Sequence, residues 1–276
     1  MDKMLKSFEK RIKRFLQLPL FMMVFGSLIF LLMAFCFTDD FINKQKNKPK
    51  VKSAYKEKET FLKQLLEKQS LTFEKINILL CAYKKEKELV LYVKSPEAKT
   101  YVKLKTYLIC EQSGVLGPKR KQGDGQVPEG FYYINHFNPE SAYHLSLGIT
   151  YPNASDRIKT TAKDPGGAIY IHGECVTIGC MPMTNDKIKE IYVLALQAYQ
   201  SGQKKIPVYS FPCQLTKENM EDLKSTYKTQ ADLLAFWLNL KEGYDKFNSS
   251  KSELNVMVSK NGDYIDRKST RLNSSH

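Results

Sequence analysis

The chain has 276 residues, which is enough for one domain of ordinary size plus appendages. A formal net charge of +14 favours acidic envelope polymers or anionic lipid headgroups as partners. Nucleic acid is the rival partner, but no aromatic-basic motif or zinc finger supports it, and a basic surface without any specific partner also stays open.

The first segment has the pattern of a membrane anchor. The first fourteen residues are mostly basic and polar, and an uncharged apolar run extends farther along the chain from Leu20 to Phe37. About twenty apolar residues are what a helix needs to cross a bilayer, and a basic stretch before them is typical of targeting segments. Because Phe35 and Phe37 stand where a cleavage site wants small residues, we predict an uncleaved signal anchor over residues 1–38 that makes the membrane a partner.

The flanks of this run decide the predicted compartment. Basic residues stand on both sides of it, so counting positive charges leaves the orientation open. Asp39 and Asp40, directly after the run, favour an external C-terminus. We therefore expect the following domain on the outer side of this membrane. The function that the family resemblance described below implies requires the same side, which would be the cell envelope on the periplasmic side of the inner (cytoplasmic) membrane.

Two further segments flank the predicted core domain. Residues 39–58 are polar and lysine-rich, which predicts a spacer, and 61–69 has helical spacing of its apolar residues, so we expect a linker with a short helix over 39–75. Residues 266–276 resemble the translation of a sequencing-library adapter and are excluded as a read-through artefact. Removing their three basic and one acidic residues from +14 leaves a net charge of about +12.

Strands dominate the middle of the chain, and helices follow them. Two apolar, β-prone runs joined by "KKEK" predict a hairpin, and alternating or apolar runs predict further strands. The strands expected are 76–83, 88–94, 100–111, 131–137, 143–151, 166–173 and 206–211. A 3.6-residue period from Ile188 to Tyr199 predicts a helix capped by Thr184 or Asn185. Strands followed by helices indicate a mainly β or α+β core over 76–212 with a helical C-terminal extension over 213–265.

The stretch "YIHGECVTIGCMPMTND" combines a histidine with two cysteines. A cysteine attacks a carbonyl as its thiolate, so it needs a base or a positive field nearby. His172 ends a predicted strand, and Cys180 lies just before a predicted helix whose N-terminus would stabilise a thiolate. Gly173 and Gly179 let the backbone turn closely around them. The N–H groups near Gly179 and Cys180 are the expected oxyanion hole.

Structural interpretations of these cysteines compete with the catalytic one. A buried cysteine is most often a small apolar residue, and Cys175 could form a local disulfide with Cys180. His172, Cys175 and Cys180 could ligate zinc, but no fourth ligand and no CxxC pair is evident. Five cysteines follow the apolar run, so if they pair, at least one thiol stays free. Cys110 is expected to be structural, and no metal or organic cofactor is implied.

A family resemblance adds weight to catalysis. "IHG", followed by "TIGC" and a helix, resembles the signature of the L,D-transpeptidase (YkuD-type) catalytic domain. Residues 127–131, Val-Pro-Glu-Gly-Phe, are similar to the entry segment of that domain. The short "HGxCxxxGC" loop is typical of the periplasmic murein L,D-transpeptidase-like subgroup. The resemblance implies a β-sandwich core with Cys180 as nucleophile and His172 as general acid/base, and the Gly173 backbone is a candidate to orient the imidazole.

This chain departs from the family pattern at two positions. Ile178 stands where most members have a second histidine, and Pro182 stands where most have an arginine thought to engage substrate. The usual substrate contacts therefore do not carry over. Thr177 fits the Ser/Thr position of the family and could hydrogen-bond in the site. Lys119 and Arg120 are candidates for binding substrate carboxylates, against the alternative of an ordinary solvated loop.

The resemblance also implies a reaction. The expected partner is a peptidoglycan stem peptide, whose diaminopimelate residue forms a thioester with Cys180 that an amine then resolves. A hydrolase of the same family, cleaving a stem-peptide or diaminopimelate–lipoprotein bond, is the alternative within enzymes. An envelope-binding module with inert cysteines is the alternative outside them.

Overall fold

The computed structural model describes residues 40–266. The predicted signal anchor over 1–38 and all but the first residue of the predicted artefact lie outside these residues. No helix within 40–266 is long and apolar enough to cross a bilayer. The chain divides into a unit that ends at Asn47 and a unit that begins at Lys48, and the fold below is that of the second unit.

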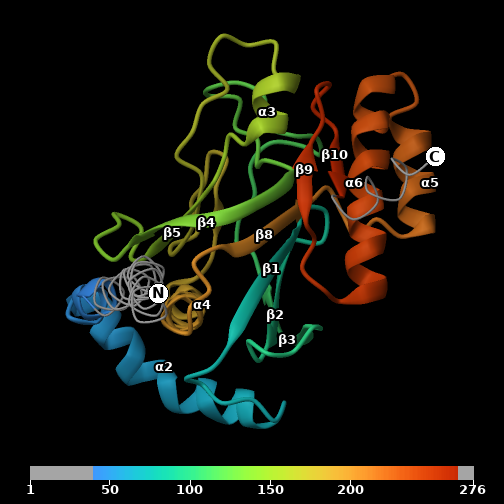
Figure 1. Cartoon of the computed structure of the whole chain (residues 1–276). Helices are drawn as coiled ribbons and strands as arrows, with labels where there is room; N and C mark the ends of the chain where they lie inside the picture. Colours follow the sequence, from blue (N-terminus) through green and yellow to red (C-terminus); the bar gives the residue numbers. More distant parts are fainter. Residues whose placement is uncertain (1–39, 267–276) are drawn as a thin grey trace, which may run out of the picture. The chain divides into compact units, whose positions relative to one another are not determined.

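One mixed sheet of eight strands forms the centre of the domain, in the order β3-β2-β1-β8-β4-β5-β6-β7 (Figure 1). Only the β1–β8 and β6–β7 pairs are parallel. The strands are β1 Asn77–Tyr83, β2 Glu88–Lys94, β3 Val102–Leu108, β4 Gly130–Asn138, β5 Ser146–Ile149, β6 Tyr170–His172, β7 Met181–Pro182 and β8 Ile206–Phe211. Every residue of β8 is buried, as expected of a strand in the middle of a sheet covered on both faces.

The structure confirms an α+β fold. The β1–β3 meander and the β4–β7 group belong to one mixed sheet, because β8 pairs with β1 on one side and with β4 on the other. Helix α4, Asn185–Gln200, makes this possible by carrying the chain back from β7 to the middle of the sheet. Its cap is Thr184, whose side chain accepts a hydrogen bond from the Lys187 N–H.

The expected spacer is a helix over most of its length. Helix α2 runs from Pro49 to Glu67 and packs on α4. Its buried residues recur at helical spacing: Val51, Ala54, Leu62 and Leu66. Lys58 reaches Asp186 and lies 4.0 Å from Glu190 of α4. The lysine content that suggested a solvated spacer therefore belongs to a helix with one buried apolar side.

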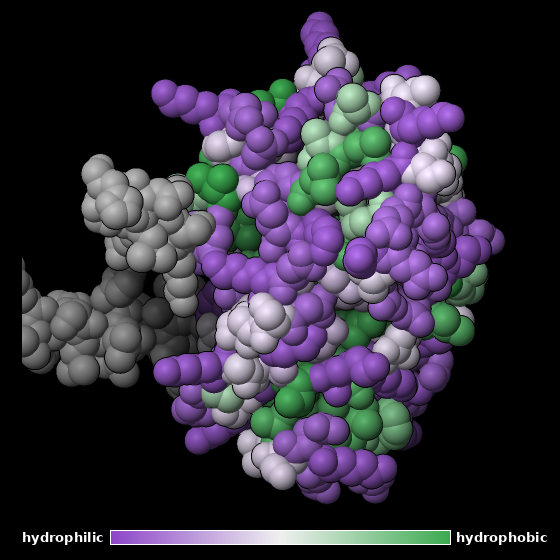
Figure 2. Space-filling view, turned by 90° about the vertical axis from the view of Figure 1, so that its right-hand side faces the viewer, coloured by the Kyte–Doolittle hydropathy of each residue, from purple (hydrophilic) through white to green (hydrophobic). Residues whose placement is uncertain are grey.

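The C-terminal extension packs against the sheet rather than forming a separate body. It contains α5 Lys217–Thr226, α6 Ala231–Ser250 and a hairpin of β9 Val256–Val258 and β10 Tyr264–Asp266. Trp237 of α6 is fully buried, and Phe131 of β4 makes an edge contact with Tyr264 of β10, with ring centroids 4.9 Å apart. Figure 2 shows this side of the molecule as a mainly hydrophilic surface with separate apolar patches. The remaining helix, α3 Ala154–Lys159, lies between β5 and β6 in the chain.

Candidate active site

The pairing of β6 with β7 brings the chain segments of the histidine and the cysteine together. The two strands are parallel, with Ile171 opposite Met181 and His172 opposite Pro182. Cys180 directly precedes β7, and a backbone hydrogen bond from Tyr170 of β6 acts on its thiol. The strand pair therefore brings the chain segments of His172 and Cys180 together, although eight residues separate them in sequence.

The imidazole of His172 is held in one tautomer. Its Nδ1 lies 2.6 Å from the carbonyl oxygen of Gly173. Because a carbonyl only accepts hydrogen bonds, Nδ1 carries the proton and Nε2 keeps a free lone pair in the neutral ring. His172 is 2% exposed, and this burial lowers its pKa from the ordinary value, although the Gly173 carbonyl and the Glu174 charge act in the opposite direction. The ring is thus neutral at pH 7 and able to take a proton.

Cys180 is a free, partly exposed thiol. Burial raises its pKa, and a backbone hydrogen bond from Tyr170 and the charge of Lys119 only partly offset that effect. The prediction that a helix N-terminus stabilises the Cys180 thiolate is wrong. β7 and two more residues separate Cys180 from the start of α4, and a helix dipole acts mainly within the first turn. The resting cysteine is therefore a thiol that needs a base, rather than a stable thiolate.

Thr177 organises the loop between the two residues. Its Oγ1 accepts hydrogen bonds from the N–H groups of Gly179, at 3.2 Å, and Cys180, at 2.8 Å, and donates to the Cys180 carbonyl at 2.9 Å. A hydroxyl has one donor and two acceptor sites, and all three are used within this loop. Thr177 therefore hydrogen-bonds in the site, as expected, and the N–H groups of Gly179 and Cys180, the expected oxyanion hole, donate to its hydroxyl.

Gly179 is required where it stands. Its φ is +130°, and a Cβ at this position would lie 3.0 Å from the backbone oxygen of Gln126. The loop that carries Cys180 can therefore approach the segment before β4 only without a side chain.

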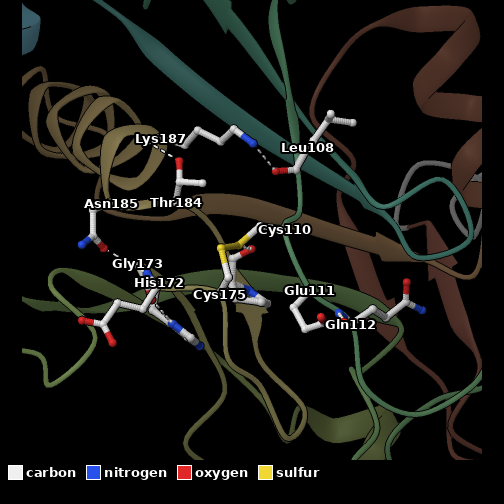
Figure 3. Close-up of a disulfide and its surroundings, with 12 residues drawn as sticks. Leu108, Cys110, Glu111, Gln112, His172, Gly173, Cys175, Thr184, Asn185 and Lys187 are labelled. Atoms are coloured by element: carbon white, nitrogen blue, oxygen red, sulfur yellow. Dashed lines mark hydrogen bonds between the residues drawn. A yellow bond between two sulfur atoms is a disulfide. The ribbon is translucent and has the colours of Figure 1, made fainter.

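A disulfide joins Cys175 to Cys110, with 5.5 Å between their Cα atoms (Figure 3). In Figure 3, Cys110 comes from the segment after β3, and Cys175 comes from the loop after β6, near His172 and Gly173. This pairing excludes the local Cys175–Cys180 bond and removes Cys175 from the zinc interpretation. It leaves Cys180 free, while Cys81 and Cys213, the other two thiols among the described residues, are buried.

Lys119 and Arg120 are paired inside the protein instead of facing open solvent. Lys119, 4% exposed, contacts Asp124 at 2.7 Å. Arg120 contacts Asp156 at 2.9 Å, and its guanidinium lies over the Phe236 ring, 5.0 Å from the centroid. Both predicted carboxylate contacts are therefore already made by carboxylates of the chain itself. Lys119 acts on the site through its charge, which favours the Cys180 thiolate.

Two contacts of the site escaped the sequence reasoning. The backbone of the 168–170 segment approaches the thiol, with the Ala168 oxygen 3.9 Å from the Cys180 sulfur. The ring of Tyr143 lies on that of His172, with centroids 4.7 Å apart. No motif marks either position, because both come from loops whose approach is decided by the fold of the whole sheet.

Comparison with known proteins identifies the family of this chain. The L,D-transpeptidase catalytic domain family (YkuD) matches residues 79–208, inside the predicted core. The chain is 41% identical over 185 residues to the protein named "Putative L,D-transpeptidase YafK" of Escherichia coli K12, covering 66% of this chain and 71% of that protein.

Two solved structures are more distant. The helical cell shape determining protein Pgp2 of Campylobacter jejuni is 20% identical, with a TM-score of 0.41 over 67% of this chain and 73% of that one. Bd1075 of Bdellovibrio bacteriovorus is 17% identical, with a TM-score of 0.35 over 62% of each chain. From the family match and the 41% identity to YafK, the chain belongs to the YkuD family of L,D-transpeptidase catalytic domains.

Proposed function

We propose that the protein is a cysteine acyltransferase of the L,D-transpeptidase type that acts on peptidoglycan stem peptides. The observation that carries this proposal is the pairing of β6, which ends at His172, with β7, which begins directly after Cys180, together with the contact of His172 Nδ1 with the Gly173 carbonyl. Family membership supports the substrate class.

In the first half-reaction, His172 acts as a general base and then as a general acid. Nε2 takes the proton from the Cys180 thiol while the sulfur attacks the carbonyl at the L-centre of diaminopimelate. A C–S bond forms and the C–N bond to the next residue breaks. The imidazolium gives its proton to the leaving amine, so charge and protons balance. A thioester of Cys180 remains.

The second half-reaction reverses these roles. An incoming amine loses a proton to the neutral His172, attacks the thioester and forms a new amide, and the Cys180 thiol is restored. If water enters instead, the product is a carboxylic acid and the protein is a hydrolase of stem-peptide or diaminopimelate–lipoprotein bonds. The hydrolase is the second candidate function because Ile178 and Pro182 stand where most of the family has a second histidine and an arginine, so the usual substrate contacts of a transpeptidase do not carry over.

We place the protein in the cell envelope, on the periplasmic side of the inner membrane, with its first 38 residues as the anchor. The Cys110–Cys175 bond supports this placement, because disulfides persist in oxidising compartments and are rare in the cytosol.

Mass spectrometry of muropeptides tests the proposal. Diaminopimelate-type peptidoglycan is incubated with the purified protein, with Cys180→Ala, and with Cys213→Ala, which removes a buried thiol away from the site. New cross-linked dimers or exchanged terminal D-amino acids that vanish only in Cys180→Ala establish transpeptidation. Released tripeptides or lipoprotein remnants without dimers establish hydrolysis. Identical products from the wild type and Cys180→Ala would refute catalysis by this cysteine.

A further inference from the structure

The turn between β4 and β5 places an aromatic ring on the proposed general base. The rings of Tyr143 and His172 have centroids 4.7 Å apart and are inclined by 33°, so they meet face to face more than edge to face. Tyr143 is 45% exposed, whereas His172 is 2% exposed. The tyrosine ring therefore covers the imidazole on a side that would otherwise be open to water.

The backbone of this turn is bound to the end of β6. The Gly173 N–H donates to the Leu145 carbonyl at 3.0 Å. His144 has a φ of +66°, the left-handed conformation that sharply redirects a chain. A Cβ at Gly173 would lie 2.9 Å from the Tyr143 carbonyl oxygen. The close approach that brings Tyr143 onto His172 therefore requires both the unusual backbone at His144 and a glycine at 173.

Helix α2 and its N-terminal flank hold the same turn from the other side. Lys50 donates to the Ser141 carbonyl at 2.8 Å, and Lys48 contacts Glu140 at 2.8 Å. The Ser141 hydroxyl in turn accepts from the Tyr143 N–H at 3.1 Å. Contacts with residues about ninety positions earlier in the chain thus fix this turn. A loop that only connects two strands does not require such contacts.

We infer that Tyr143 is a positioning residue for His172: its ring keeps the imidazole in the orientation in which Nδ1 meets the Gly173 carbonyl. This inference rests on the proposed function and adds a residue to it. The phenol oxygen makes no hydrogen bond to any residue within 40–266, so the ring is the part that acts. Glu174 is the charged group that acts on the His172 ring.

Kinetics of two variants separate a positioning role from a structural one. Tyr143→Phe keeps the ring, and we expect its kcat within about twofold of wild type. Tyr143→Leu fills similar space without a flat face, and we expect kcat to fall about tenfold or more with KM within twofold, because a loosely held base forfeits part of the 10²–10⁴-fold that general acid–base catalysis supplies. Tyr133→Leu, a half-buried tyrosine of β4, is the matched control and should behave as wild type.

An NMR titration of the histidine rings gives a readout that needs no activity. His172→Gln identifies the His172 signal in the full chain. We expect Tyr143→Phe to titrate as wild type and Tyr143→Leu to titrate at higher pH, because water reaches the imidazole and its burial is relieved. A Tyr143→Leu variant with wild-type kcat and wild-type titration would overturn the inference. An equal fall in kcat in Tyr143→Phe and Tyr143→Leu would overturn it too. If the wild type modifies no peptidoglycan, the proposed function fails, and the titration alone still decides the contact.

Discussion

Glu129 accepts hydrogen bonds from both Lys84 and Trp237, and all three side chains are buried. One carboxylate oxygen lies 2.9 Å from the Lys84 ammonium and the other 2.8 Å from the indole nitrogen of Trp237. Lys84 also donates to the carbonyls of Gly117 and Val127. The segment before β4, which approaches Cys180, and the C-terminal extension are therefore joined at one carboxylate.

Removing the cation from this cluster should destabilise the protein strongly. Lys84→Met leaves the Glu129 charge buried without its partner, and we expect a loss of about 3–5 kcal/mol in the free energy of unfolding. Lys241→Met, which breaks the exposed pair with Asp245, should cost less than about 1 kcal/mol. Urea unfolding followed by circular dichroism measures both, and equal losses in the two variants would show that the buried cluster has no special role.

The disulfide should contribute substantially to stability. The Cys110–Cys175 bond closes a segment of 65 residues, for which chain entropy predicts about 4 kcal/mol. We expect Cys110→Ser/Cys175→Ser to unfold at lower urea concentration by that amount. Dithiothreitol should shift the wild type in the same direction and leave the double variant unchanged. A reductant effect of the same size on both proteins would point to another cause.

Thiol labelling should single out Cys180. Peptide mapping after iodoacetamide treatment of the native protein is expected to find Cys180 modified first. Cys81 and Cys213 should react at least roughly a hundredfold more slowly, since both are fully buried and wait for local opening. Equal rates at all three, or none at any, would remove the main physical support for a catalytic cysteine.

The pH profile of kcat/KM should reflect a neutral base and a neutral thiol. His172 works as a base only when unprotonated, and burial puts its pKa below 6.5. The value of kcat/KM therefore reaches its maximum above this lowered pKa and falls as the pH decreases through it. On the alkaline side it should hold through pH 8, because the Cys180 pKa lies above 9.0. A loss of activity between pH 7 and pH 8, where an imidazolium would give up its proton, would instead indicate a thiolate–imidazolium pair.

Local patterns predicted what depends on local structure. The β1–β2 hairpin and α4 follow from alternation, turn residues and a threonine cap, and the histidine predicted to end a strand is the last residue of β6. The second half of helix α2 was predicted as a short helix, but its first half was predicted as a spacer because lysines are interspersed among its few apolar residues, although Val51 and Ala54 have helical spacing. The internal ion pairs of Lys119 and Arg120 depend on carboxylates that only the fold brings near.

Long-range contacts could not be read from the chain. Cys175 has Cys180 five residues away and Cys110 far upstream, and nothing in the spacing favours the distant partner. Tyr143 is one of sixteen tyrosines, and its place on His172 depends on a left-handed residue, a glycine, and one lysine before and one within the first turn of α2. Such contacts are set by how strands pair across the sheet, which sequence periodicity does not specify.

The partner of Cys175 matters to Cys180 as much as to the loop. Thiols that lie close in a chain oxidise readily to a disulfide, and a free Cys175 would have the proposed nucleophile as its neighbour. By occupying Cys175, Cys110 protects Cys180 from being consumed in an internal bond. Cys110→Ser alone should consequently lower the activity that depends on the Cys180 thiol more than Cys110→Ser/Cys175→Ser does. The distant Cys110 thus keeps the proposed nucleophile in its free form.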